Sequence, residues 1–281
     1  MKARLLTALI GIPAILLLLF FGTKFPFIID IVLSLASAMC VAEVLHTGGM
    51  LKKYYISIPS ILFSLSIPYI IMTEFLAEVI FVYFIIMFAC MIFFHQKVKF
   101  FNACVSFCFT LIISFGLSSL IPLFMVDRRL TVYYFVVGLA ATWLADSGAL
   151  FSGMLFGKHK LCPTISPKKT VEGAIGGVIC CTLFMLVTGL IFDKAVFPNC
   201  EISANVNYIN LSIISFACAV VSIIGDLTFS LIKRNYNAKD YGNIFPGHGG
   251  VLDRFDSAIF VCLVLFAIIL VVTKITGGTL W

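Results

Sequence analysis

Residues 246–257 of this chain read PGHGGVLDRFDS, and residues 230–245 directly before them read SLIKRNYNAKDYGNIF. Charged residues and glycines gather in these two stretches, whereas the sequence on either side is apolar. Charge is scarce in the chain as a whole, because 62% of its 281 residues are hydrophobic and only 11% are charged. An ordinary soluble domain carries about a quarter charged residues. The composition therefore indicates an integral membrane protein.

Apolar runs of roughly 20 residues are long enough to cross a bilayer as helices. The runs in this chain are continuous rather than alternating, which favours helices over the strands of a barrel. We therefore predict an all-α integral membrane protein with about nine transmembrane helices. The runs span about 4–22, 26–45, 56–72, 75–94, 101–125, 131–153, 171–192, 209–232 and 256–273. We interpret the first run as a retained anchor, because no small-residue cleavage site follows it.

The distribution of basic residues predicts how the chain is oriented in the membrane. With nine spans, the N-terminus and the even-numbered loops share one side, and 14 of the 19 Lys and Arg residues fall there, against 5 on the other side. Cytoplasmic loops carry an excess of basic residues. The count therefore predicts a cytoplasmic N-terminus and a C-terminus outside.

Two long polar loops, near 154–170 and 233–255, lie on the predicted cytoplasmic side. The spans before them carry Asp146 and Asp226, and a carboxylate inside a membrane is costly unless it serves a function. In the sequence GDLTFSLIKR, Asp226, Ser230 and Lys233 follow helical spacing and share one face. Asp253 and Asp256 would also share a face if the next helix begins there.

The second loop combines both signs of charge. Flanking basic residues alone would indicate contact with anionic lipid headgroups. The acidic residues oppose the positive-inside trend and suit a divalent cation, with basic side chains receiving phosphate oxygens. The acids are Asp226, Asp240, Asp253 and Asp256, and the bases include Lys233, Arg234, Lys239 and Arg254. Gly247, Gly249 and Gly250 would leave backbone N–H groups free for an anion, with His248 as a further donor.

The first loop offers a second anion site. Ser166 and Pro167 are typical of an N-cap and a first helical position. In that case Lys168, Lys169 and Thr170 lie at the positive end of a helix, where phosphate binds readily. Glu172 would pair with Lys168 or reach a metal, and Gly173 and Gly177 form a G-x-x-x-G pair that permits close helix packing. Together the two loops predict a cytoplasm-facing, metal-dependent phosphate site at the membrane surface.

The segment 230–256 resembles the phosphatidate cytidylyltransferase family, also called CDP-diacylglycerol synthases. It matches the signature S-x-hydrophobic-K-R, four residues, K-D-x-small, two residues, hydrophobic-P/G/S-x-H-G-G-hydrophobic-x-D-R-hydrophobic-D at every specified position. The upstream segment DSGALFSGMLFGKHKLCPTISPKKTVEG, residues 146–173, is similar to a second conserved region of the family. Leu150 and Thr164 depart from residues common in the family, so neither is expected to be a ligand.

The resemblance implies that CTP and phosphatidate react to give CDP-diacylglycerol and pyrophosphate. Residues 1–130 would hold about five transmembrane helices, and residues 131–281 would form the catalytic transmembrane region. It implies catalytic roles for Asp226, Lys233, Arg234, Lys239, Asp253 and Arg254. It implies substrate binding by Ser166, Lys168, Lys169, Thr170, Ser230, Asp240, His248, Gly249 and Gly250. Metal ligands would be Asp226, Asp253 and Asp256, with Asp146 and Glu172 as further candidates.

Magnesium is the implied cofactor, with a second, monovalent cation such as K⁺ as a further option. The implied partners are CTP, phosphatidate and membrane lipid, with no nucleic acid, and the implied location is a bacterial inner membrane that the chain crosses several times. Small-residue helix faces and family precedent would suit a homodimer. Both substrates are anionic, and phosphatidate supplies its own nucleophilic oxygen, so no protein nucleophile is required.

Two other classes of function remain open on the sequence. A CTP-dependent lipid-alcohol kinase would release CDP rather than pyrophosphate. A cation-coupled transporter could use Asp146 and Asp226, although the polar residues cluster at one face and the chain shows no inverted repeat.

Overall fold

The computed structural model describes residues 22, 25, 27–122, 131–191, 208–242, 244 and 249–276. Within these residues the chain forms eight helices with defined bounds and one short hairpin. The helices are α2 (Phe27–Thr47), α3 (Tyr54–Ile70), α4 (Leu76–Phe93), α5 (Phe100–Ser118), α7 (Thr131–Phe156), α8 (Val171–Ile191), α9 (Tyr208–Asn235) and α10 (Leu252–Thr276). The hairpin pairs β1 (Lys160–Cys162) with β2 (Ser166–Thr170) in antiparallel fashion.

These eight helices coincide with the second to ninth predicted apolar runs. Five helical stretches are long and apolar enough to cross a membrane: α2, α4, the stretch Phe100–Pro122 that contains α5, α8 and α9. Helix α3 is apolar but shorter, with 17 residues. The prediction of an all-α membrane protein is confirmed. The first predicted run, 4–22, lies outside the described residues except for Gly22.

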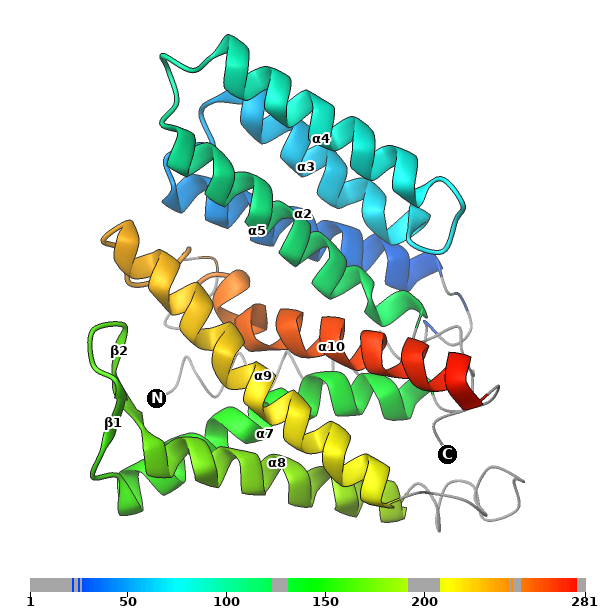
Figure 1. Cartoon of the computed structure of the whole chain (residues 1–281), viewed down its shortest axis with the longest axis vertical. Helices are drawn as coiled ribbons and strands as arrows, with labels where there is room; N and C mark the ends of the chain where they lie inside the picture. Colours follow the sequence, from blue (N-terminus) through cyan, green and yellow to red (C-terminus); the bar gives the residue numbers. More distant parts are fainter. Residues whose placement is uncertain are drawn as a thin grey trace.

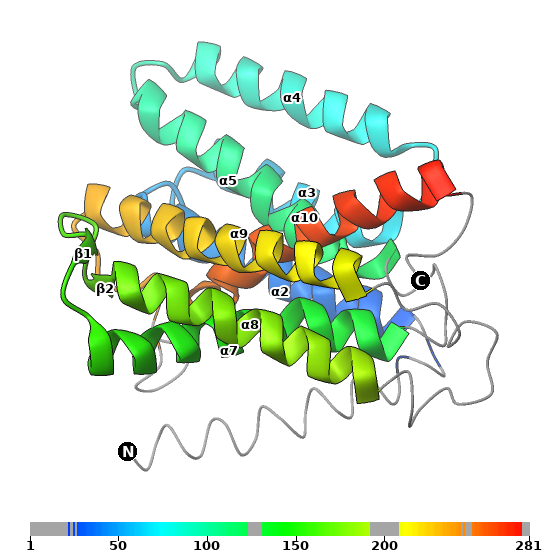
Figure 2. The ribbon, with the colours of Figure 1, turned by 60° about the horizontal axis from the view of Figure 1, so that its bottom comes forward.

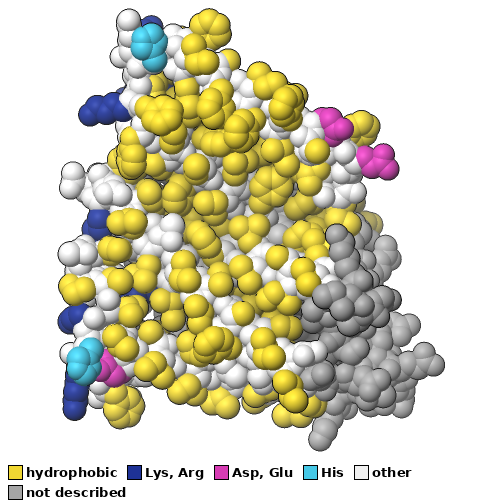
Figure 3. Space-filling view, viewed as in Figure 1, with side chains coloured by type: hydrophobic (Ala, Val, Ile, Leu, Met, Phe, Trp, Pro, Cys, Tyr) yellow, Lys and Arg dark blue, Asp and Glu magenta, His cyan; other side chains and the backbone are white. Residues whose placement is uncertain are grey.

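Successive described helices run in opposite directions, so their connections alternate between two ends of the molecule (Figure 1). The connections α2–α3, α4–α5, α7–α8 and α9–α10 all lie at the end that carries the hairpin, at the left in Figure 1, and Figure 2 shows the same grouping from another side. In Figure 3, the Lys and Arg side chains of this face line the same edge, whereas hydrophobic side chains cover the broad surface. The two polar loops identified in the sequence are therefore neighbours at one end of the helices.

Helices α9 and α10 lie between the helices α2–α5 and the pair α7–α8 (Figure 1). Phe229 of α9 is fully buried, and its ring makes edge contacts with Phe109 of α5 and Phe260 of α10, with ring centroids 5.2 and 5.9 Å apart. Gly116 of α5 lies against Ile259 of α10 so closely that an added Cβ would come within 2.4 Å of the Ile259 Cγ2. Helix α5 therefore packs closely against both α9 and α10.

Helices α7 and α8 pack through glycines. A Cβ on Gly173 would lie 2.7 Å from the Ala149 carbonyl oxygen, and one on Gly177 would lie 2.7 Å from the Ala145 carbonyl oxygen. Real Cβ atoms do not approach so closely, so the G-x-x-x-G pair has the structural role predicted for it. Because α7 occupies this small-residue face, the two glycines are used inside the chain rather than in a contact with a second copy.

The start of α8 differs from the sequence-based expectation. Ser166–Thr170 forms β2 instead of a helical turn, and the helix begins at Val171. The cap is Thr170, whose Oγ1 accepts a hydrogen bond from the Gly173 amide at 3.1 Å. The prediction of Ser166 as N-cap was wrong by four residues, because pairing of residues 166–170 with β1 holds this segment in an extended conformation, and a proline is tolerated in a strand at the edge of a sheet.

We predict that Gly177→Val separates α7 from α8 and destabilises the protein by about 1–3 kcal/mol, the usual cost of overpacking a tight contact. The measurement is thermal unfolding of the purified protein in detergent. Val187→Leu, which adds bulk at a 51% exposed position of the same helix, should leave the midpoint unchanged. Equal midpoints for the two variants would contradict the proposed packing.

Candidate active site

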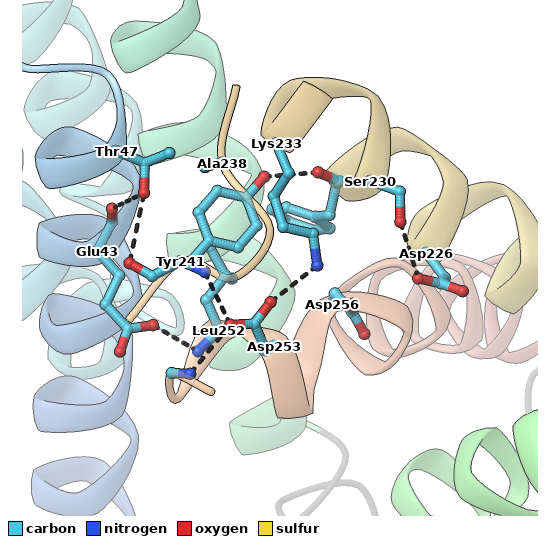
Figure 4. Close-up of polar contacts among 12 residues, drawn as sticks. Glu43, Thr47, Asp226, Ser230, Lys233, Ala238, Tyr241, Leu252, Asp253 and Asp256 are labelled. Carbon is cyan, nitrogen blue, oxygen red and sulfur yellow. Dashed lines mark hydrogen bonds and ion pairs between the residues drawn. The ribbon is translucent and has the colours of Figure 1, made fainter. Parts of the chain in front are cut away.

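The centre of the polar loop is the Asp253 carboxylate in the first turn of α10. Its Oδ1 accepts the Lys233 ammonium of α9 at 2.8 Å. Its Oδ2 accepts the backbone amides of Tyr241 at 2.8 Å and Gly250 at 3.0 Å. The Asp253 and Lys233 side chains are 5% and 11% exposed. Figure 4 shows Asp253 at the meeting point of α9, α10 and the loop between them.

Tyr241 anchors the loop between α9 and α10. Its hydroxyl donates to the Phe229 carbonyl oxygen at 2.8 Å, and the Lys233 ammonium lies 5.3 Å from its ring centroid. Burial, together with the nearby negative charge of Asp253, raises the pKa of the Tyr241 phenol. The phenol therefore stays protonated and keeps its donor role.

Glu43 of α2 reaches the same loop and was missed in the sequence. It is 7% exposed, and its two oxygens accept the backbone amides of Val251 at 2.9 Å and Leu252 at 2.8 Å (Figure 4). A signal was available, because Glu43 is a carboxylate inside a predicted apolar run. The argument that singled out Asp146 and Asp226 applies to it equally.

Three carboxylates converge from three helices: Asp146 of α7, Asp226 of α9 and Asp256 of α10. The Ser257 hydroxyl bridges two of them, at 3.1 Å from the Asp146 Oδ2 and 3.2 Å from the Asp256 Oδ1. Asp226 lies close enough to interact electrostatically with both Asp146 and Asp256. Like charges repel at such range, so the cluster favours binding of a cation.

The hairpin supplies positive charge to this cluster. Lys169 of β2 forms an ion pair with Asp226, and the Ser230 hydroxyl one turn along α9 lies 3.4 Å from the Asp226 Oδ1. Arg234 at the end of α9 donates from Nε to the Ile165 carbonyl oxygen at 3.2 Å and from Nη1 to the Ala238 carbonyl oxygen at 3.2 Å. The two polar loops, about 70 residues apart in sequence, are thus joined by direct contacts.

Glu172 has partners other than those expected. Its carboxylate accepts the His159 ring Nδ1 at 2.6 Å and the backbone amides of Lys158 and His159 at 3.1 and 3.2 Å. Pairing with Lys168 was one of the two roles predicted for Glu172, the other being a metal ligand. Lys168 lies in β2 rather than in the predicted helix, so it is not one helical turn from Glu172. Glu172 therefore fastens the base of the hairpin to the first turn of α8.

The remaining predicted residues differ in their exposure. Lys168, Lys239 and Asp240 are exposed, and Ser166 is partly exposed in β2. Arg254 is exposed, and its carbonyl oxygen accepts the Trp143 indole N–H at 3.5 Å. Gly249 has a φ of +82°, as expected for a glycine turn, and Gly250 is buried. Gly247 and His248 lie outside the described residues.

The residues fit a magnesium ion that shares its coordination with substrate. Among the described residues there is no group of three or more His, Cys, Asp or Glu side chains arranged as a metal cage. Mg²⁺ usually binds through one or two carboxylates together with substrate phosphates and water. Asp226 and Asp256 provide hard oxygen donors of that kind, although Asp226 is also paired with Lys169. The Asp253 side chain is more deeply buried than that of Asp226, and two of its three hydrogen bonds come from backbone amides.

The fold and this site define a class: an α-helical membrane protein that gathers carboxylates and basic side chains at one end of its helices, as chemistry on phosphate groups requires. The model of the cytidylyltransferase family matches residues 2–272, and the chain belongs to this family.

Several curated bacterial relatives are similar to the chain. The phosphatidate cytidylyltransferase of Bacillus subtilis is 44% identical over 147 residues, which cover 51% of this chain and 51% of the relative. That of Haemophilus influenzae is 45% identical over 128 residues, or 46% and 41% of the two chains, and that of Staphylococcus haemolyticus is 41% identical over 138 residues, or 49% of each. The chain thus spans about half the length of the curated relatives it matches.

We predict that Lys233→Met destabilises the protein by about 3 kcal/mol, because removing one partner of a buried ion pair leaves the other charge uncompensated. The measurement is the denaturation midpoint in detergent. The matched control is Lys52→Met, which removes an exposed lysine at the same end of the molecule and should have no effect. A Lys233→Met protein as stable as this control would show that the pair does not hold α9 to α10.

Proposed function

We propose that this protein transfers the cytidylyl group of CTP to phosphatidate, giving CDP-diacylglycerol and pyrophosphate for phospholipid biosynthesis. The observation that carries the proposal is the convergence of Asp146, Asp226 and Asp256 with Lys169 in a member of the cytidylyltransferase family. The names of the curated bacterial relatives support the same reaction.

In the proposed reaction a phosphate oxygen of phosphatidate attacks the α-phosphorus of CTP, and the bond from that phosphorus to the pyrophosphate oxygen breaks. The attacking oxygen is already ionised, so no general base is needed. The difficulty is the approach of two anions, which positive charge must screen. Magnesium, when bound, would neutralise phosphate charge and help to stabilise the leaving pyrophosphate.

The basic residues divide between two tasks in this proposal. Lys169 contacts the carboxylate cluster, and Arg234 contacts the hairpin that carries Lys169. Both are suited to contact substrate phosphates, with exposed Lys168 and Lys239 nearby in sequence. Lys233 is committed to Asp253 and is buried. We therefore assign Lys233 and Asp253 the task of holding α9 and α10 together, and Asp226 and Asp256 the task of holding the metal.

We further propose that the chain crosses the plasma membrane of a bacterium several times, with nine spans, a cytoplasmic N-terminus and an external C-terminus. The support is the grouping of basic side chains and both polar loops at one end of the helices, together with the positive-inside trend. A site at that level meets CTP from the cytosol and phosphatidate from the bilayer.

The reaction is tested with purified protein in detergent, phosphatidate, Mg²⁺ and CTP labelled in the cytidine ring. We expect labelled liponucleotide and an equal amount of unlabelled pyrophosphate, because each transfer releases one pyrophosphate. Asp226→Asn should make neither product, whereas Glu78→Gln, which removes an exposed carboxylate of α4, should match the wild type. Release of CDP with phosphorylation of an added lipid alcohol would identify a kinase instead.

The metal assignment makes a separate prediction. A chelator should abolish turnover, and added Mg²⁺ should restore it. Asp256→Asn should lower kcat by about 100-fold or more, comparable to the loss of one group that stabilises transition-state charge, and should raise the Mg²⁺ concentration for half-maximal rate. An Asp256→Asn enzyme with the Mg²⁺ dependence of the wild type would contradict this assignment.

A further inference from the structure

Glu43 lies almost 200 residues before the signature segment, yet it contacts that segment directly. Its oxygens accept the amides of Val251 and Leu252, the last loop residue and the first residue of α10. The first amides of a helix have no partner within the helix. A carboxylate at this position satisfies them and also interacts favourably with the positive end of the helix dipole.

The loop is shaped around this carboxylate. A Cβ on Gly242 would lie 2.6 Å from the Glu43 Oε1, and a Cβ on Gly250 would lie 2.4 Å from the Oε2. Thr47, one turn further along α2, donates its hydroxyl to the Glu43 carbonyl oxygen at 2.9 Å, and this hydroxyl also lies 3.4 Å from the Tyr241 carbonyl oxygen. Helix α2 therefore contacts both ends of the loop, near 241–242 and near 250–252.

The first two turns of α10 carry two of the acidic residues. Asp253 follows Leu252 directly, and Asp256 lies one helical turn later. Gly250, which Glu43 touches, also donates its amide to the Asp253 Oδ2. A shift of these turns would therefore displace Asp253 from Lys233 and Asp256 from the neighbourhood of Asp146 and Asp226.

We propose that Glu43 is a positioning residue: it holds the first turn of α10 so that Asp256 faces Asp226, and it does not touch substrate itself. Both of its oxygens accept backbone amides inside the protein and the residue is buried, so it is not available as a base or as a metal ligand. The inference rests on the proposed function, since positioning is defined with respect to that reaction.

The test compares Glu43→Gln with Asp30→Asn in the full chain in detergent. Each Glu43 oxygen accepts one backbone amide. In Glu43→Gln an NH₂ group replaces one of these oxygens and cannot accept the N–H that faces it. Asp30 is also a carboxylate of α2, but it lies roughly 20 Å along the helix from Glu43, at about 1.5 Å per residue. Turnover is expressed per folded molecule, with the folded fraction measured from thermal unfolding and size-exclusion chromatography.

We expect Glu43→Gln to lower kcat per folded molecule by about 10- to 100-fold, as a small misplacement of reacting groups does. The Mg²⁺ concentration for half-maximal rate should rise, because Asp256 is displaced. Asp30→Asn should match the wild type in both quantities. A merely structural role would reduce the folded fraction of Glu43→Gln but leave kcat per folded molecule and the Mg²⁺ dependence unchanged, and that result would overturn the proposal.

If the proposed function is wrong, the wild type itself will form no CDP-diacylglycerol, which separates that outcome from a failure of the Glu43 proposal alone. In that case the rate of hydrogen–deuterium exchange in the segment 249–256 tests whether Glu43 holds this segment in place. Faster exchange in Glu43→Gln than in Asp30→Asn would support the role of Glu43 in fixing this turn. Equal exchange in the two variants would overturn it.

Discussion

The buried ion pair between Lys233 and Asp253 is the interaction on which the arrangement of the site depends. The pair connects the end of α9 to the start of α10. The second Asp253 oxygen accepts hydrogen bonds from the amides of Tyr241 and Gly250. Charges buried in this way are costly unless each is paired and hydrogen-bonded. The three partners of the Asp253 carboxylate, namely the Lys233 ammonium and the amides of Tyr241 and Gly250, meet that requirement when the loop and the two helices adopt one particular arrangement. The pair therefore fixes where the neighbouring groups lie.

The sequence predicted those features that depend on local pattern. Continuous apolar runs identified the helices that the structure describes, and helical spacing placed Asp226, Ser230 and Lys233 on one face, where the Ser230 hydroxyl indeed contacts Asp226. The G-x-x-x-G pair predicted close packing of α8, because a missing side chain has a direct steric meaning. These inferences needed only the periodicity of a helix and the size of a residue.

The features that were missed depend on contacts between distant segments. Ser166–Pro167 has the composition of a helix start, but pairing with β1 decided its conformation, and Thr170 became the cap. Helical spacing offered Lys168 as one possible partner of Glu172, whereas the hairpin places His159 next to it. Glu43 could have been noticed as a buried acid, but its partners at 251 and 252 follow only from the packing of α2 beside α10.

The ion pair between Lys169 and Asp226 gives the carboxylate cluster a counter-ion from within the chain. A divalent cation that binds the Asp226 oxygens has to displace this ammonium, so uptake of the cation is coupled to release of the lysine, and a doubly charged ion replaces a singly charged group. The released Lys169 ammonium is then available to pair with an arriving anion. Asp226 therefore has a counter-ion before any metal binds, and a bound divalent cation would increase the attraction of the cluster for anions.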